Sequence, residues 1–312
     1  MNNRFFSKLA ASNIKKNGKA YIPYILSCVM TVALFYIVKS LSYNPGLKNM
    51  VGSSTMMTMM SMCSVIIALF AIVFLFYTNS FLMKRRKKEF GVFNILGMEK
   101  SHIAKTMAWE NFYVTFISIV GGLVIGLALD KAMFLLIAQV LNEEITLGFF
   151  ISDKAIISTI VMFCVIFLLI LLNSIRQIHT ANPIELVTAG NAGEREPKTK
   201  WVLAILGLLS LGAGYYIALT IENPLTALVY FFFAVILVII GTYMLFTAGS
   251  IALLKILRKN KKYYYKTKHF TSISGMIYRM KQNAVGLANI CILSTAVLVM
   301  VSSTSSLMLC RM

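Results

Sequence analysis

Residues 21–41 read YIPYILSCVMTVALFYIVKSL and contain a single charged side chain, Lys39. About twenty consecutive, mostly apolar residues are enough for a helix to cross the hydrocarbon core of a bilayer. The run is longer than the apolar core of a signal peptide, and no small-x-small cleavage site follows it. We therefore predict that this segment is a retained membrane-spanning helix.

Six other stretches of the chain have the same apolar character and enough length to cross a bilayer. They are residues 56–82, 111–138, 155–175, 201–220, 225–254 and 284–308. Of the 312 residues, 58% are hydrophobic and 13% are charged, whereas soluble domains carry roughly 25% charged residues. This composition argues against a soluble enzyme, a nucleic-acid-binding domain and a disordered tail. The predicted fold class is all-α: a polytopic membrane protein with about seven transmembrane helices.

The basic residues gather in four of the segments between the apolar stretches. With the N-terminus inside, these inner segments are residues 1–20, 83–110, 175–200 and 255–283, and they hold 25 of the 30 Lys and Arg residues. The acidic residues divide almost evenly between the two sides, so the formal net charge of +19 lies on the inner side. This asymmetry follows the positive-inside rule of membrane proteins. It predicts a cytoplasmic N-terminus, an extracellular C-terminus, attraction to anionic lipid and no nucleic-acid partner.

The sequence contains none of the short motifs that mark common catalytic or metal sites. It has no GxxxxGK[ST] phosphate loop, no HExxH, no GxSxG and no CxxC pair. We therefore predict no catalytic residue, no metal site and no cofactor. Charged residues in mid-membrane, which mark ion paths, are nearly absent, so an ion-coupled carrier is disfavoured. Asp130, near one end of the third stretch, is expected to reach water.

Two further patterns in the N-terminal half predict an interfacial helix and a contact between membrane helices. Apolar residues near helical spacing within residues 1–20, with lysines elsewhere around the helix, predict a short amphipathic helix in the inner membrane interface. Gly122 and Gly126 form a GxxxG motif, which lets two membrane helices approach closely. We interpret the two glycines as a helix-packing site.

The most informative inner segment is residues 84–110, KRRKKEFGVFNILGMEKSHIAKTMAWE, between the second and third apolar stretches. Its middle is apolar, with Gly91 and Gly97 as breaks, and it predicts a short apolar helix on the inner face. Such a surface needs a cover. Two covers remain open at this point: lipid, or a groove on a motor subunit.

The same segment resembles the signature loop of FtsX-like permeases, in the order of a basic cluster, a Glu, Phe-Gly and Leu-Gly-Met. Three more blocks extend the resemblance to the Bce-type permeases of peptide-antibiotic ABC transporters, of the bacitracin-resistance kind. They are FSKLAASNIKKNGKAYIPYILS (6–27), RQIHTANPIELVTAG (176–190) and ISGMIYRMKQNAVGLANICILSTAVLV (273–299). The resemblance runs almost from end to end and implies an FtsX-like (MacB-type) ABC permease fold.

The resemblance also implies a division of the chain and a set of partners. The segments are an N-terminal helix (1–20), a first span (21–41), an FtsX-like permease domain (56–175), a cytoplasmic linker (176–200) and three further spans (201–312). The implied partners are a dimeric ABC ATPase that docks below the permease and a membrane histidine kinase. The implied setting is the plasma membrane of a bacterium, where such systems detach peptide antibiotics from lipid-linked cell-wall precursors.

The eight residues that we predict to couple the permease to the ATPase all lie in the segment 84–110. They are Glu89, Phe90, Gly91, Leu96, Gly97, Met98, Ser101 and Ile103. The apolar side chains are expected to fill a groove on the ATPase, the glycines to let the chain turn, and Glu89 to pair with a cation of the ATPase. The alternative function is a non-transporting membrane scaffold that holds a sensor kinase through its intramembrane faces.

Permeases of this type have ten helices and a large extracellular domain between the seventh and the eighth. The present sequence ends at Met312, after the seventh apolar stretch. We therefore expect it to be the N-terminal part of a longer permease, or a split or truncated product. Because that extracellular domain would carry much of the drug sensing, no drug-contact residue is predicted here.

Overall fold

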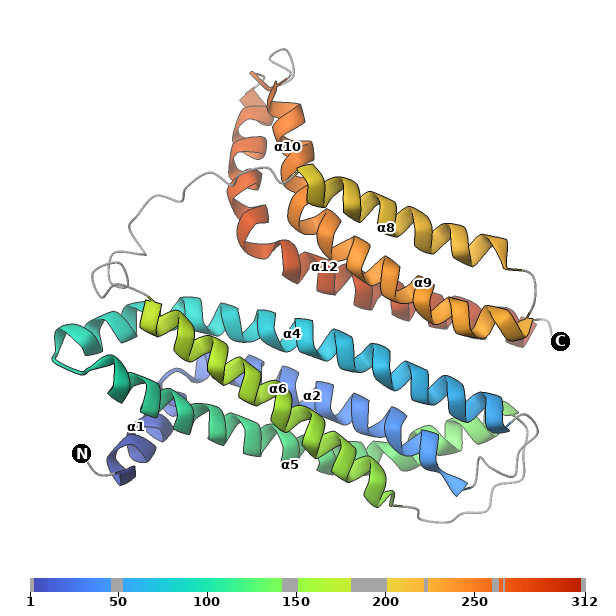
Figure 1. The fold of residues 1–312 in the computed structure, drawn as a ribbon, viewed down its shortest axis with the longest axis horizontal. Coiled ribbons are helices and arrows are strands. Elements are labelled where there is room, and N and C mark those ends of the chain that lie inside the picture. The colour runs from blue at the N-terminus through green and yellow to red at the C-terminus, as the bar shows by residue number, and fades with distance from the viewer. Residues whose placement is uncertain are drawn as a thin grey trace. The chain divides into compact units, whose positions relative to one another are not determined.

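The computed structural model describes residues 3–45, 53–141, 151–180, 201–221, 224–259, 264–265 and 267–309. The elements are helical throughout these residues, with no strand among them (Figure 1). They are α1 (Asn3–Lys16), α2 (Gly18–Tyr43), α4 (Ser53–Ile95), α5 (Lys100–Leu141), α6 (Asp153–Thr180), α8 (Trp201–Thr220), α9 (Pro224–Met244), the π-helix η1 (Leu245–Gly249), α10 (Ser250–Lys259) and α12 (Thr267–Leu309). The chain forms two compact units, Met1–Ala192 and Gly193–Met312.

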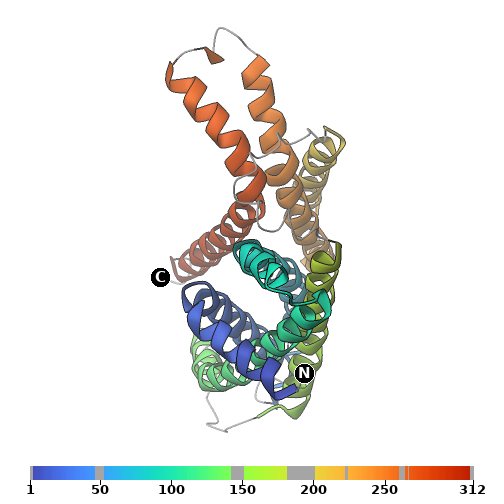
Figure 2. The same cartoon turned by 90° about the vertical axis from the view of Figure 1, so that its left-hand side faces the viewer.

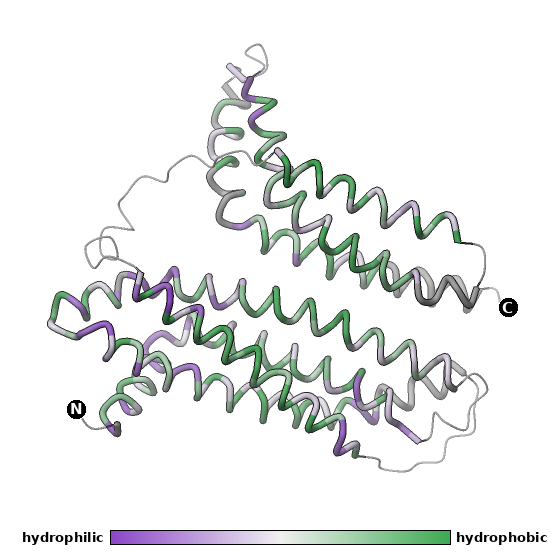
Figure 3. The backbone as a smooth tube through the Cα atoms, in the orientation of Figure 1, coloured by the Kyte–Doolittle hydropathy of each residue, from purple (hydrophilic) through white to green (hydrophobic). Residues whose placement is uncertain are grey.

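Six of the described helical segments are long and apolar enough to cross a membrane. They are Gly18–Tyr43, Met57–Lys87, Lys100–Ala132, Asp153–Thr180, Trp201–Thr220 and Tyr230–Lys259. Figure 3 shows their apolar middles and the polar residues toward their ends. In α12, Asn283–Leu298 form a shorter apolar stretch where a seventh span was predicted over 284–308. The predicted all-α polytopic fold class is confirmed, and seven is an approximate count.

Helix α2 is the central helix of the first unit. It packs against α4, α5 and α6, which run beside it in Figures 1 and 2. It is also buried more fully than any of the other five span-length helices. The space between the four helices is filled by apolar side chains that include Cys28, Val32, Phe35, Leu75, Phe163 and Phe167. This core fixes the four helices of the first unit against one another.

Two glycines set how closely α5 approaches α2. A β-carbon at Gly122 would lie 2.5 Å from the Cβ atom of Val32, and one at Gly126 would lie 2.8 Å from Cδ1 of Tyr36. Side chains of any size would have to push the two helices apart at these points. The GxxxG motif therefore lies at the α2–α5 crossing, which is the place where small residues allow a close approach.

Asp130 lies one turn beyond Gly126 on α5 and is covered by α2. Its Oδ2 atom accepts a hydrogen bond from the Ser40 hydroxyl at 3.0 Å, and the residue is only 6% exposed. The expectation that Asp130 reaches water is therefore wrong. The sequence places it near a helix end, but the close packing of α2 on α5 buries it.

The segment 84–110 differs from the short helix predicted there. Helix α4 continues without interruption from its apolar stretch to Ile95, and α5 begins at Lys100. The segment is therefore the closed end of a long helical hairpin. Gly91 lies inside α4 and does not break it. Helix α6 likewise extends to Thr180, into the predicted linker 176–200, of which residues 181–200 lie outside the described residues.

The second unit is built on the pair α8 and α9. Three glycines stand at this contact: β-carbons at Gly207 and Gly214 would lie 2.8 Å from side-chain atoms of α9, and one at Gly241 would lie 2.9 Å from the backbone of α8. The Ser210 hydroxyl donates a hydrogen bond across it to the Leu237 carbonyl at 2.8 Å. Through η1, α9 continues into α10, which packs on α12.

Candidate functional site

The α4–α5 hairpin closes in a tight turn at Gly97. The Leu96 and Gly97 amides donate hydrogen bonds to the carbonyls of Val92 and Asn94, and the Met98 amide reaches back to the Phe93 carbonyl at 2.9 Å. Gly97 has a φ of 92°, in the left-handed region where residues with a side chain are strained. This is the usual way for a helix to end at a glycine, and it returns the chain at once into α5.

The inner side of the hairpin is a small apolar core. Its buried members are Met83, Phe90, Ile103, Met107 and Ile178, with Phe93 and Met98 partly buried against them. Phe90 and Ile103 are therefore buried inside the protein, although they were predicted to fill a groove on the ATPase. Met98 packs against the same core. In this structure their side chains hold α4, α5 and α6 together.

Three apolar side chains at the end of α4 point away from this core. Val92 is 48%, Ile95 68% and Leu96 76% exposed. We call Val92, Ile95 and Leu96 the exposed tip. Leu96 is one of the eight predicted residues, whereas Val92 and Ile95 are not. The helical period separates the buried residues from the exposed ones. Residues 90 and 93 lie on one face of the helix, and residues 92, 95 and 96 lie on the opposite face.

The remaining predicted residues have local roles in the hairpin. Gly91 is buried within α4. The Ser101 side chain is exposed and donates a hydrogen bond to Glu99 at 3.1 Å, in the first turn of α5. Glu89, predicted to meet a cation of the ATPase, instead accepts a hydrogen bond from Arg86 of its own helix at 3.2 Å.

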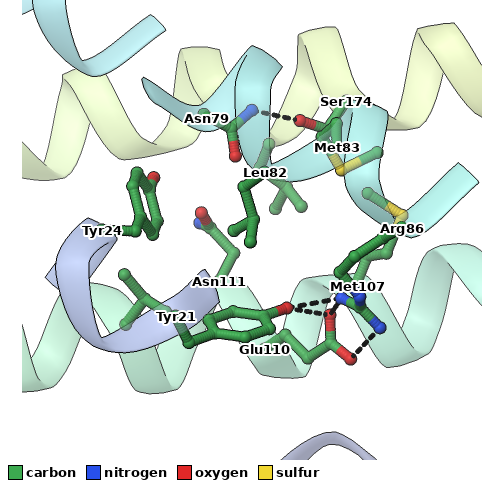
Figure 4. Close-up of a pocket in the computed structure, with 12 residues that line it drawn as sticks. Tyr21, Tyr24, Asn79, Leu82, Met83, Arg86, Met107, Glu110, Asn111 and Ser174 are labelled. Atoms are coloured by element: carbon green, nitrogen blue, oxygen red, sulfur yellow. Dashed lines mark hydrogen bonds and ion pairs between the residues drawn. The ribbon is translucent and has the colours of Figure 1, made fainter. Parts of the chain in front are cut away.

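A buried ion pair joins the two helices of the hairpin at its base. The guanidinium of Arg86 on α4 contacts both carboxylate oxygens of Glu110 on α5, with Nη2 3.0 Å from Oε1. The two side chains are 3% and 5% exposed. The Tyr21 hydroxyl of α2 donates to Glu110 at 2.9 Å and contacts Arg86, as Figure 4 shows. A charge pair this deep is tolerated only with such additional hydrogen bonds.

Helix α1 is tied to the same ion pair. The Asn13 side-chain amide donates to Glu110 at 2.9 Å, and the Asn17 amide donates to Glu89 at 3.0 Å. We call Asn13, Asn17, Tyr21, Arg86, Glu89 and Glu110 the Arg86 cluster. Phe6 of α1 is buried and stacks on His102 of α5. The apolar face of the predicted amphipathic helix is thus covered by α5 of the same chain, not by the membrane interface alone.

Apart from Glu89, the residues of the Arg86 cluster are not among the predicted site residues. Arg86 belongs to a run of five basic residues. In the sequence it cannot be told apart from its neighbours, which are explained by the positive-inside rule. Lys84 and Arg85 are indeed exposed, and Arg86 is buried. One signal was available: Glu110 is a lone acid at the mouth of an apolar stretch, and such a residue needs a partner.

Beside the ion pair lies a small cavity of about 30 Å³ between α2, α4, α5 and α6. Polar groups that line it include Tyr24, Asn79, Asn111 and Ser174, and the Asn79 side chain donates to the Ser174 hydroxyl at 2.8 Å (Figure 4). A volume of this size corresponds to about one water molecule. The cavity is therefore far too small for a peptide or a nucleotide.

The described residues offer no candidate metal centre, since no group of three or more His, Cys, Asp or Glu side chains comes together among them. Cys28, Cys63, Cys164 and Cys291 are free thiols in the structure.

Comparison with known proteins finds a family whose model matches this hairpin. Residues 61–183 match the family model described as FtsX-like permease C-terminal. This region covers most of α4, all of α5 and all of α6, including the exposed tip and the ion pair.

Relatives in bacteria match most of the chain. It is 34% identical over 279 residues to the uncharacterized ABC transporter permease YvcS of Bacillus subtilis, which covers 88% of this chain and 43% of that protein. It is 29% and 25% identical to the bacitracin export permease protein BceB of Halalkalibacterium halodurans and of Bacillus subtilis, over 89% of this chain and 44% and 45% of those proteins. The chain thus spans less than half the length of the curated relatives that it matches.

Proposed function

We propose that the chain is part of a permease driven by a separate ATPase, since residues 61–183 match the FtsX-like permease family model and the relatives are named as permeases. A permease is a multi-pass membrane subunit and carries no ATPase chemistry of its own. In this proposal a dimeric ABC ATPase hydrolyses ATP, and the α4–α5 hairpin receives its movement.

The observation that carries this proposal is the exposed tip. Val92, Ile95 and Leu96 are exposed apolar side chains at the closed end of the hairpin, where Phe90 and Ile103 are buried. Exposed apolar patches of this kind mark contact sites for lipid or for protein. A helix end that presents an apolar face is suited to a groove on a partner.

The charge distribution supports a cytoplasmic position for the tip. Five basic residues, 84–88, precede it on α4, and Lys100 and Lys105 follow on α5. Lys and Arg are retained on the cytoplasmic side of membrane proteins. An ATPase that uses cytoplasmic ATP would then have access to the hairpin. The same orientation gives a cytoplasmic N-terminus and an extracellular end of the chain.

The names of two relatives suggest a substrate class. Both are called bacitracin export permeases, so we propose a peptide antibiotic as the compound against which the complete system acts. Lipid-linked cell-wall precursors, with which such peptides associate, are the proposed site of action. The 30 Å³ cavity gives no room for a peptide, and no peptide-contact residue is proposed. A membrane histidine kinase is a further proposed partner.

The test is co-purification of the ATPase with Leu96→Asp. A charge at the most exposed tip position has to be desolvated in an apolar groove, so we expect ATPase recovery to fall about tenfold or more. Asn94→Asp is the matched control, because it places the same charge two residues away, near the same helix end, and leaves the three tip residues intact. The control should recover the ATPase as the wild type does.

Two outcomes would contradict the proposal. One is full ATPase recovery with Leu96→Asp. The other is a wild-type chain that binds the histidine kinase but no ATPase, which would favour the alternative function, a non-transporting scaffold.

A further inference from the structure

The Arg86 cluster lies where four helices of the first unit meet. Arg86 belongs to α4, Glu110 to α5 and Tyr21 to α2, and the two asparagines come from α1 and from the α1–α2 junction. The exposed tip begins only about two turns beyond Arg86 on the same helix, and Ile95 lies about 14 Å along α4 from it at 1.5 Å per residue. The cluster therefore lies close to the tip along the same helix.

The junction between α1 and α2 is itself part of the cluster. Asn17 lies between the two helices, and its carbonyl accepts hydrogen bonds from the amides of Ala20 and Tyr21. Its side-chain amide is not used as a helix cap and donates to Glu89 on α4 instead. The α1–α2 junction is thus bonded directly to the helix that leads to the exposed tip.

Helix α1 makes its other specific contacts to α5. Besides the Asn13–Glu110 hydrogen bond, Ser7 and Tyr113 share a hydrogen bond of 2.8 Å, and the Phe6 ring stacks on His102 with centroids 5.6 Å apart. Lys105 of α5 lies over the same ring, 5.8 Å from its centroid. Helix α1 is therefore attached to both arms of the hairpin: to α4 through Asn17 and to α5 through Asn13, Ser7 and Phe6.

We propose that Arg86 is a positioning residue that makes α1 and the α4–α5 hairpin move as one body, so that ATP-driven movement of the exposed tip is passed to α1 and to the α1–α2 junction. The inference rests on the proposed function, since it needs an ATPase at the tip. Arg86 suits this role because its planar guanidinium bonds to Glu110 and Glu89 together, which a lysine ammonium cannot do with the same fixed geometry. Asn13 and Asn17 then link the two carboxylates to α1.

The experiment compares the double variant Asn13→Ala/Asn17→Ala with wild type and with Ser12→Ala, in the permease co-purified with its ATPase. Ser12 is an exposed neighbour on α1, so it serves as the matched control. Hydrogen exchange of the α1 amides is measured with and without ATP. We expect ATP to alter α1 exchange in wild type and in Ser12→Ala, and we expect the alteration to shrink roughly tenfold in the double variant while ATPase recovery is unchanged.

Arg86→Met is the second arm, because it removes the charge that holds both carboxylates. We expect it to lose the ATP response of α1 as well, and Arg86→Lys to restore only part of it. The double variant keeps the ion pair, so it tests the proposal even if Arg86→Met fails to fold.

Three results would overturn the inference: no ATP response of α1 in wild type, a full response in the double variant, or an equal loss in Ser12→Ala. Failure of the docking proposal is distinguishable, because it appears as ATPase recovery with Leu96→Asp and not as a change in α1.

Discussion

The guanidinium of Arg86 and the carboxylate of Glu110 face each other between α4 and α5, 24 residues apart in sequence, with both side chains almost fully buried. This pair closes the base of a hairpin whose tip carries three exposed apolar residues. The arrangement puts the buried ion pair beside the other helices of the first unit and the exposed residues at the end of the hairpin.

Loss of one partner of this pair should destabilise the protein more than loss of both. Arg86→Met leaves Glu110 charged and buried without its cation, at an expected cost of about 3–5 kcal/mol. In Arg86→Met/Glu110→Met both charges are gone, and apolar side chains of similar length fill the space. Thermal unfolding of the purified protein in detergent measures the difference. The interpretation fails if the double variant unfolds at a lower temperature than either single variant.

Substitutions of Phe90 and of Ile95 should distinguish the stabilising role of the hairpin core from the docking role of the exposed tip. Phe90→Ala removes a ring that is buried between α4, α5 and α6, at an expected cost of about 3–5 kcal/mol. Ile95→Ala truncates an exposed side chain, so the free energy of unfolding should change by no more than about 0.5 kcal/mol. Ile95→Ala should nevertheless reduce ATPase recovery. Equal effects of the two substitutions on thermal unfolding would argue against this division.

Glycine should be required at position 97 because of the backbone conformation there, and not because a side chain would collide with its neighbours. A β-carbon there would meet nothing within 4 Å, but φ is 92°. Gly97→Ala should therefore cost more than about 1 kcal/mol. Gly275 in α12 is the control, because it also has open space around it but lies within a helix of ordinary geometry. Gly275→Ala should stabilise by about 0.5–1 kcal/mol. Chemical unfolding of both variants checks the opposite signs.

Gly121 and Gly122 should respond differently to the same substitution. A β-carbon at Gly122 would lie 2.5 Å from Cβ of Val32, whereas one at Gly121 would lie 3.4 Å from Cγ2 of Val29. Gly122→Ala should force α2 and α5 apart at a cost of about 1–3 kcal/mol, and Gly121→Ala should be tolerated. Thermal unfolding of the two variants, compared side by side, measures this. Equal stability would place the close α2–α5 contact elsewhere.

Much of the architecture follows from local sequence. The apolar stretches predicted the all-α polytopic class, since the length and hydropathy of one segment suffice to identify a span-length helix. The segment 84–110 was recognised as special because its apolar residues stand beside a basic run. The predicted short helix was wrong, since nothing before Gly97 stops α4 and a glycine inside a helix costs only about 1 kcal/mol.

The roles of individual residues depended on contacts between distant parts of the chain. Asn13 and Glu110 are 97 positions apart, and Arg86 differs from its basic neighbours only because Glu110 and Tyr21 lie opposite it. The sequence by itself determined the all-α polytopic class and where the positive charge gathers, because hydropathy and charge belong to single residues. Only the tertiary structure decided which apolar side chains of the hairpin are buried and which are exposed, because burial depends on what the other helices cover.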